Sequence, residues 1–316
     1  MSYSLYFILL YLVLVVWKPS RKIAIALTRW LIFACSYDWM RLLPNYEVNP
    51  IDVRGIYEAE KSLFGITAAD GTTLIPGEFF NLHNSAFADF WAGFFYLCWV
   101  PVPLGFAIWL YVKGKQPPSC PPRRGMTNNE GLKEYEEEAP SLRGRAGGEA
   151  SRDYLRHFVH FSIAFLFINL LGFGGYYISP AAPPWYVINH GFEPILNTPG
   201  SVAGLIRFDN MIHIPVFQSI YSGNSNVFAA VPSLHAAYML IATVYAVLSK
   251  QSKWVIAAFA FICVGIWWTA VYSTHHYIID VVLGIITCVL GLLLLEKVIM
   301  KIPAVARFID RYVEAI

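Results

Sequence analysis

Charged residues are scarce in this chain. Only 14% of its 316 residues are Asp, Glu, Lys or Arg, whereas about 25% is usual for a soluble domain. Hydrophobic residues reach 57%, and the mean hydropathy is +0.50. This composition excludes a disordered chain or a coiled coil for most of the length. It indicates a protein that is embedded in a membrane.

The chain also lacks an excess of positive charge and a metal-binding pattern of cysteines. Its net charge is +2, so no basic field favours a nucleic acid as partner. None of the five cysteines pairs at zinc-ligand spacing, and together they do not resemble a disulfide framework. We interpret them as small buried hydrophobes.

The sequence contains several long apolar runs. Roughly 17–25 apolar residues cross a bilayer as a helix, and five runs have this length. Two shorter N-terminal runs, separated by the basic turn at 18–22, are interpreted as two more spans, with a re-entrant hairpin as the alternative. The predicted fold is an all-α, polytopic transmembrane helix bundle with about seven spans, or alternatively six. The runs are Ser2–Trp17, Ile23–Tyr37, Phe90–Val112, His157–Ile178, Val231–Leu248, Trp254–Val271 and Tyr277–Met300.

Basic residues predict the orientation of these spans. They follow the first, third, fifth and last runs, and cytoplasmic loops carry such an excess of Lys and Arg. Seven spans place all four groups in the cytoplasm and place residues 38–89 and 179–230 on the outer side. We therefore expect N-terminal spans over residues 1–112, a membrane core over 154–300 with an outer loop at 179–230, and a cytoplasmic tail at 301–316.

Two segments are not spans. Residues 113–153 contain two Pro-Pro pairs, an acidic run and several glycines, which predicts a disordered cytoplasmic loop. This loop is either a linker or a docking site for a partner. Residues 51–64 alternate apolar and charged side chains, as in a short amphipathic helix that lies at the outer interface.

The first candidate for chemistry is the sequence Pro232-Ser233-Leu234-His235 at the outer start of a span. Ser233 is a plausible N-cap, which places His235 in the first helical turn. The free N–H groups of such a turn favour phosphate, and a histidine there can protonate a phosphate-ester oxygen. The alternative is an interfacial histidine.

The second candidate is His276 with Asp280, at the outer start of the last span. Four residues apart, the two share a helix face, so the carboxylate can hold one ring nitrogen and direct the other at a substrate. The alternatives are a pair that only joins helices and a His₂Asp metal site. His275 points elsewhere, and we expect it to be a supporting or interfacial residue.

The outer loop supplies further candidates. Residues 180–186 read Pro-Ala-Ala-Pro-Pro-Trp-Tyr, and the proline pair predicts a stiff, extended turn. Arg207 is the best cation in this loop for a phosphate, because a guanidinium binds two phosphoryl oxygens at once. A local ion pair with Asp209 is the alternative.

The two histidine motifs together resemble the type 2 phosphatidic acid phosphatase superfamily. The closer resemblance is to the inositol phosphorylceramide synthase family. It extends over the 180–186 block, Gly204–Asp209, Pro232–His235 and Trp267–Asp280, all in one order, and covers roughly residues 160–285 well. The chain departs from the phosphatases at Ala270, where they carry an arginine six residues before the nucleophilic histidine. This departure favours a transferase with a lipid acceptor.

The resemblance implies a phosphatidic acid phosphatase-like core and a phosphotransferase that moves phosphoinositol from phosphatidylinositol to the primary hydroxyl of ceramide. It implies His276 as nucleophile, Asp280 as its orienting group and His235 as the acid and base. No nucleotide, metal or other cofactor is needed, because one phosphodiester replaces another. Substrate contacts are expected from Arg207, Ser233, Trp185, Tyr186, Glu60 and His275, where Glu60 either bonds inositol hydroxyls or serves the structure.

Other functions fit parts of the pattern. A lipid phosphate phosphatase would use water as the second acceptor, and a transporter or lipid-binding scaffold would not need the histidines. A phosphorylated precursor of phosphatidylinositol, or another phospholipid, would leave the motifs unchanged as donor. The expected location is a bacterial inner membrane with a periplasmic site, and a Golgi membrane with a lumenal site is the alternative. No motif identifies a protein partner.

Overall fold

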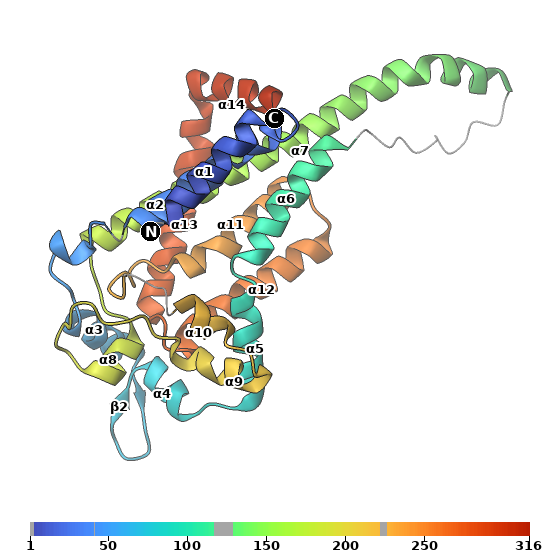
Figure 1. The fold of residues 1–316 in the computed structure, drawn as a ribbon. Helices are drawn as coiled ribbons and strands as arrows, with labels where there is room; N and C mark the ends of the chain where they lie inside the picture. The colour runs from blue at the N-terminus through green and yellow to red at the C-terminus, as the bar shows by residue number, and fades with distance from the viewer. Residues whose placement is uncertain (1–2, 41, 117–128, 222–225) are drawn as a thin grey trace.

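The chain is helical almost throughout (Figure 1). The structure is a computed structural model that describes residues 3–40, 42–116, 129–221 and 226–316. In these residues the only sheet is a two-stranded ribbon of β1 (Ile66–Thr67) and β2 (Thr73–Leu74). The predicted all-α membrane bundle is confirmed.

Four helical stretches are long and apolar enough to cross a membrane. Two further apolar helices, Ser4–Val16 and Leu234–Leu248, are shorter, and the count of seven spans stays a prediction. The four long stretches are Ala86–Lys115, made of α5 (Ala86–Leu97) and α6 (Pro101–Lys115); Glu149–Ile178, within α7 (Asn129–Ile178); α12 (Lys253–Tyr272); and Ile278–Lys301, made of α13 (Ile278–Lys297) and a 3₁₀ turn at Ile299–Lys301.

The two N-terminal runs form a helical hairpin of α1 (Tyr3–Val16) and α2 (Arg21–Trp39). The helices are antiparallel, since the Ser4 N–H donates to Asp38 at 3.0 Å and the hydroxyls of Tyr11 and Thr28 lie 2.7 Å apart. Aromatic rings of α2 pack on α7, as Phe33 does on Phe165. The hairpin therefore lies against the bundle along α7.

The segment predicted as a disordered loop differs from that prediction. Residues 117–128 lie outside the described residues, but α7 already begins at Asn129 and continues without a break into the apolar span. Leu, Glu, Lys, Arg and Ala prevail between 132 and 146, and their helix propensity extends the helix beyond the membrane. The tail is also helical, because α14 (Pro303–Ala315) packs on α7 and pairs Arg152 with Glu314 at 3.0 Å.

An outer layer covers the end of the bundle that lies opposite α14 (Figure 1). The predicted amphipathic segment is α3 (Arg54–Phe64), but α3 does more than lie at an interface. It exposes Leu63 and buries Ile56, Tyr57 and Glu60 against the outer loop and α13. The other short helices of the layer are α4 (Pro76–Leu82), α8 (Pro184–His190), α9 (Ile206–Ile212) and α10 (Val216–Tyr221), with 3₁₀ turns at Asn45–Glu47 and Ala203–Leu205.

Helix α11 (Leu234–Leu248) is the centre of the core and packs against α7, α12 and α13. A glycine allows the start of α11 to approach α13 closely. A Cβ on Gly284 would lie 2.1 Å from the carbonyl oxygen of Ser233, a distance that no side chain tolerates. This close approach brings the two histidine motifs together.

Candidate active site

The first motif lies at the start of α11. Ser233 is at the N-cap position, as predicted, but the expected side-chain cap is wrong, because its hydroxyl bonds no backbone N–H of the helix. Its own N–H donates instead to the main-chain oxygen of Asp280 at 3.0 Å. This bond ties the His235 turn to α13 and leaves the buried Ser233 hydroxyl without a partner among the described residues.

The second motif differs from the predicted shared helix face. His276 lies in the turn before α13, which begins only at Ile278. The pair still forms, because Asp280 turns its carboxylate back over the helix start. Its Oδ2 accepts the Tyr277 N–H at 3.0 Å and lies 3.3 Å from Nδ1 of His276. The cap of the helix and the orientation of the histidine thus depend on the same oxygen.

The two histidines meet directly. Nδ1 of His235 lies 3.0 Å from Nε2 of His276. If Nδ1–H of His276 donates to Asp280, Nε2 of His276 holds a lone pair and His235 must donate to it. We call Asp280, His276 and His235 the relay. In it, the unprotonated Nε2 of His276 faces the position that His235 occupies, where a substrate atom could take the place of the His235 ring.

Glu60 binds the start of α13, next to the second motif. Its carboxylate accepts the N–H groups of Ile278 and Ile279 at 2.8 and 3.1 Å, and its side chain is only 1% exposed. Burial raises the pKa of Glu60, and the two N–H bonds oppose that rise. Both oxygens thus bind the start of α13, which supports the structural role among the two that the sequence leaves open. The structural alternative is the one that we retain.

We expect Glu60→Ala to lower the melting temperature and the turnover together. The substitution leaves two N–H groups buried without acceptors, at a cost of about 1–3 kcal/mol each. Glu60→Gln keeps one acceptor oxygen and should be intermediate. Glu58→Ala, on the exposed side of the same helix, is the control for melting and turnover in detergent. A loss of inositol binding at unchanged melting temperature would contradict the structural role.

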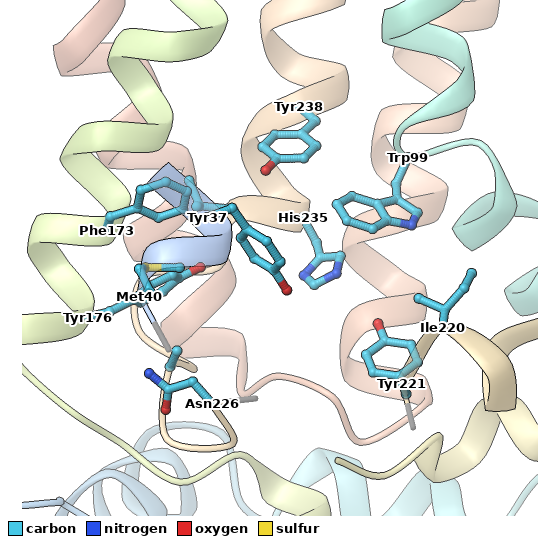
Figure 2. A pocket seen from close by; sticks show the side chains of 12 residues that line it. Tyr37, Met40, Trp99, Phe173, Tyr176, Ile220, Tyr221, Asn226, His235 and Tyr238 are labelled. Carbon is cyan, nitrogen blue, oxygen red and sulfur yellow. The ribbon is translucent and has the colours of Figure 1, made fainter. Parts of the chain in front are cut away.

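An apolar cavity of about 130 Å³ opens beside His235 (Figure 2). The imidazole of His235 projects into it, and the hydroxyls of Tyr37 and Tyr221 point toward the same space. Its wall is otherwise mostly aromatic or aliphatic and comes from α2, α7, α10 and α11. The lining residues are Tyr37, Met40, Trp99, Phe173, Tyr176, Ile220, Tyr221, Asn226, Ala229, Leu234, His235 and Tyr238.

A second, more polar cavity lies on the other side of His235. It contains both relay histidines together with His275, Trp185 and Ser201. Among the described residues that line either cavity, none is a lysine or an arginine. A phosphate here would meet neutral donors, and the dipole of the α11 N-terminus adds to them.

His275 lines this polar cavity. Its Nδ1 lies 3.0 Å from the Ser273 hydroxyl, and its ring packs between Tyr96 and Tyr221. Burial, with His276 nearby, lowers the pKa of His275 to about 3, so it is neutral near pH 7. Its Nε2 makes no hydrogen bond of good geometry within the described chain. The predicted supporting position is consistent with this placement.

The two aromatic residues of the proline-rich block 180–186 have different surroundings. Trp185 lines the polar cavity, and its expected substrate contact stays a prediction. Tyr186 does not, because its buried hydroxyl donates to the Glu193 carbonyl at 2.8 Å and accepts the Ile195 N–H at 2.7 Å. These two bonds give Tyr186 a role in fixing the loop conformation, and its expected substrate contact stays a prediction.

Arg207 lies outside both cavities. Its Nε donates to Asp89 at 2.6 Å, and the guanidinium stands over the ring of Tyr272. The alternative pair with Asp209 does not form, since that carboxylate accepts the N–H groups of Phe217 and Gln218. Asp89 lies 118 residues away in the sequence, which hides the pair from local spacing. The predicted phosphate contact has no support from this position.

We expect Arg207→Ala and Asp89→Ala to lower melting temperature and turnover together, with Asp89→Ala at least as damaging because its carboxylate also accepts the Tyr272 hydroxyl at 2.8 Å. Asp89 is 8% exposed, and removal of one partner of a largely buried ion pair costs on the order of 3 kcal/mol. The double variant should be no worse than Asp89→Ala, and Arg307→Ala, on the exposed face of α14, is the control. If Arg207→Ala alone lost turnover at a wild-type melting temperature, the phosphate role would be restored.

Several site residues have no signal in the sequence. Tyr96 stacks on His235 with ring centres 5.0 Å apart, and Trp99 lies 4.5 Å from the same ring. Both come from the α5–α6 stretch, and Tyr37 comes from α2. An apolar span is rich in aromatics, so nothing in the local pattern distinguishes a ring that faces the histidine from one that faces lipid.

The helical membrane fold and the pair of histidine motifs are shared with a known superfamily. The PAP2 superfamily matches residues 151–294, which contain both histidine motifs. Over 94% of this chain and 85% of the relative, the sequence is 52% identical to the phosphoinositol dihydroceramide synthase of Bacteroides thetaiotaomicron. The chain therefore belongs to the inositol phosphorylceramide synthase family, and it is an integral membrane enzyme.

Fungal members of the family are more distant. The inositol phosphorylceramide synthase of Candida albicans is 35% identical over 39% of this chain and 26% of its own length. The Saccharomyces cerevisiae catalytic subunit is 33% identical over 37% of this chain and 29% of its own length. No solved structure matches the chain significantly.

Proposed function

We propose that this protein transfers phosphoinositol from phosphatidylinositol to the primary hydroxyl of ceramide or dihydroceramide. The observation that carries the proposal is the relay of Asp280, His276 and His235, with contacts of 3.3 and 3.0 Å. The name of the Bacteroides relative, a phosphoinositol dihydroceramide synthase, supports the substrate class.

The first half-reaction forms a phosphohistidine. Nε2 of His276 attacks phosphorus with its lone pair, and the bond from phosphorus to the diacylglycerol oxygen breaks. Protonated His235 gives its proton to that oxygen, so diacylglycerol leaves as a neutral alcohol. Asp280 holds Nδ1–H of His276 and stabilises the charge on the ring.

The second half-reaction transfers the group to the acceptor. His235, now neutral, takes the proton of the ceramide hydroxyl while its oxygen forms the new bond to phosphorus. The bond between phosphorus and nitrogen breaks, and its electron pair returns to Nε2 of His276. One phosphodiester replaces another, so these steps need no nucleotide or metal.

We further propose that neutral donors meet the phosphoryl oxygens. The Ser233 hydroxyl and Nε2 of His275 are buried and make no hydrogen bond of good geometry in the described chain. Ser233 lies two residues before His235, and His275 lines the polar cavity together with His235 and His276. Fixed donors of this kind stabilise charge that develops in a transition state. They suit a phosphodiester with one negative charge, as in phosphatidylinositol.

The location and the division of the chain are also part of the proposal. The similarity to a bacterial enzyme and the distribution of Lys and Arg support a bacterial inner membrane with the site at the periplasmic side. Residues 154–300, with the loop 179–230, would carry the chemistry. Residues 1–112 would complete the lipid-facing wall.

The test is mass spectrometry of the lipid products. Purified protein in detergent is mixed with phosphatidylinositol and dihydroceramide, with phosphatidylserine as the control donor. We expect a phosphoinositol sphingolipid and diacylglycerol in equal amounts. Free inositol phosphate without the sphingolipid would show a hydrolase, and absence of any product from phosphatidylinositol would exclude this donor.

A further inference from the structure

Two cavities of opposite character meet at His235. The apolar one lies toward α2 and α7, and the polar one lies beneath Trp185 and contains His276. The cavities share Tyr176, Tyr221, Asn226, Ala229 and His235. A lipid with a polar head and an apolar body can therefore extend across His235 from one cavity into the other.

The apolar cavity is open at its edge. Tyr37 is 52% exposed and Ile220 is 51% exposed, and both stand on its rim. These positions belong to the apolar surface of α2 and to the outer helix α10. A lipid chain can thus pass from outside into the cavity while its polar end reaches His235. Figure 2 shows the imidazole of His235 among the side chains that line this cavity.

The chemistry restricts which oxygen can lie beside His235. The same imidazole protonates the departing oxygen in the first half-reaction and deprotonates the attacking oxygen in the second. The second step is the reverse of the first with a different alcohol, so the two oxygens must occupy one position relative to phosphorus. Only one of the two cavities at His235 is apolar.

The apolar cavity has a volume of about 130 Å³, and His235 is one of the residues that line it. Because a single imidazole serves both half-reactions, it can exchange a proton with only one alcohol oxygen at a time. The two lipids therefore reach the reacting position one after the other.

We infer that diacylglycerol and the sphingolipid acceptor use the apolar cavity in turn, while the inositol head group stays in the polar cavity through both steps. This inference rests on the proposed function and specifies its geometry. The first lipid must leave before the second can bind.

The N-terminal hairpin then takes part in acceptor choice. Tyr37 and Met40 belong to the wall of the apolar cavity, although they lie outside the 151–294 region that the superfamily match covers. The Tyr37 hydroxyl points toward His235 (Figure 2). It is therefore placed to contact the amide or hydroxyl of a sphingoid base near the reacting oxygen.

The inhibition pattern of the wild-type protein tests the inference without any substitution. Initial rates are measured in mixed micelles with phosphatidylinositol and dihydroceramide, with added diacylglycerol as inhibitor. A shared cavity predicts that diacylglycerol is competitive against dihydroceramide, because both bind the phosphohistidine form. Inhibition that is competitive against phosphatidylinositol but not against dihydroceramide would show separate sites and overturn the inference.

A second test uses the exchange of labelled diacylglycerol into phosphatidylinositol in the absence of acceptor. Met40→Trp fills the apolar cavity and should slow this exchange and the transfer to dihydroceramide by the same factor, about tenfold. Ile32→Trp, on the same helix but 44% exposed and outside the cavity lining, should change neither. Melting temperatures confirm that each variant is folded.

The outcomes of the second test are distinguishable. If Met40→Trp slows only one of the two reactions, the lipids use different cavities and the inference fails, while the proposed function stands. If the wild-type protein shows neither exchange nor transfer, the proposed function itself fails. Equal slowing of both reactions supports a single alternating cavity.

Discussion

Replacement of His276 by alanine should abolish phosphoinositol transfer, with a loss of roughly 10⁴-fold or more, as for other catalytic nucleophiles. No other described histidine at the site pairs with a carboxylate that sets its tautomer, because His235 has none and Nδ1 of His275 lies beside the Ser273 hydroxyl instead. Transfer is measured as the phosphoinositol sphingolipid formed, and the phosphohistidine as acid-labile label on the protein. Both should disappear.

The matched control is His83→Ala. His83 is exposed, and its ring stacks on Phe79 in the outer layer, away from the relay. Transfer by this variant should equal that of the wild type. If His276→Ala kept even a tenth of wild-type turnover, the assignment of the nucleophile would be wrong.

Asp280→Asn should lower turnover by roughly 10⁴-fold, the loss seen when a histidine is held in the wrong tautomer. Oδ2 of Asp280 makes both contacts, so an amide cannot serve both in the same way. With its nitrogen at that position, the amide donates to Nδ1 of His276 and moves the ring proton to Nε2, the atom that must attack, while the Tyr277 N–H loses its acceptor. The KM for phosphatidylinositol should change little, and the fold should lose no more than one hydrogen bond, about 1 kcal/mol.

The control for this variant is Asp310→Asn, which alters a surface ion pair between α14 and α7. That substitution should leave turnover near wild type, because exposed pairs contribute about 0–1 kcal/mol. A large fall in melting temperature for Asp280→Asn would show that Asp280 serves the fold more than the histidine. Unchanged turnover would remove Asp280 from the relay.

Composition and spacing predicted much of the fold. The apolar runs predicted α12 within one residue at each end and the start of α13 within one residue, because membrane spans need a continuous apolar surface. For residues 129–152 the same reasoning gave a wrong prediction. Their glycines and charged residues predict a loop, but helix α7 continues through them into the span. The amphipathic segment at 51–64 was predicted as a helix, but its burial was not.

The site was predicted where the chemistry depends on residues near each other in sequence. His276 and Asp280 are four residues apart, and their pairing follows from short-range geometry even though His276 precedes the helix. The contact of His235 with His276 joins residues 41 apart, and it was expected from the orientation of the spans. The partners of Arg207 and Glu60 could not be predicted from local spacing, because they are distant in the sequence.

The sequence by itself determined that this chain is a helical membrane protein, which motifs carry its chemistry, and which family those motifs resemble. These properties depend on composition, on apolar periodicity and on short-range spacing. Only the tertiary structure decided that Glu60 binds the start of α13, that Arg207 pairs with Asp89, and that Tyr37, Tyr96 and Trp99 surround His235. Such contacts join residues from different helices, and packing alone selects which polar and aromatic side chains meet when those helices come together.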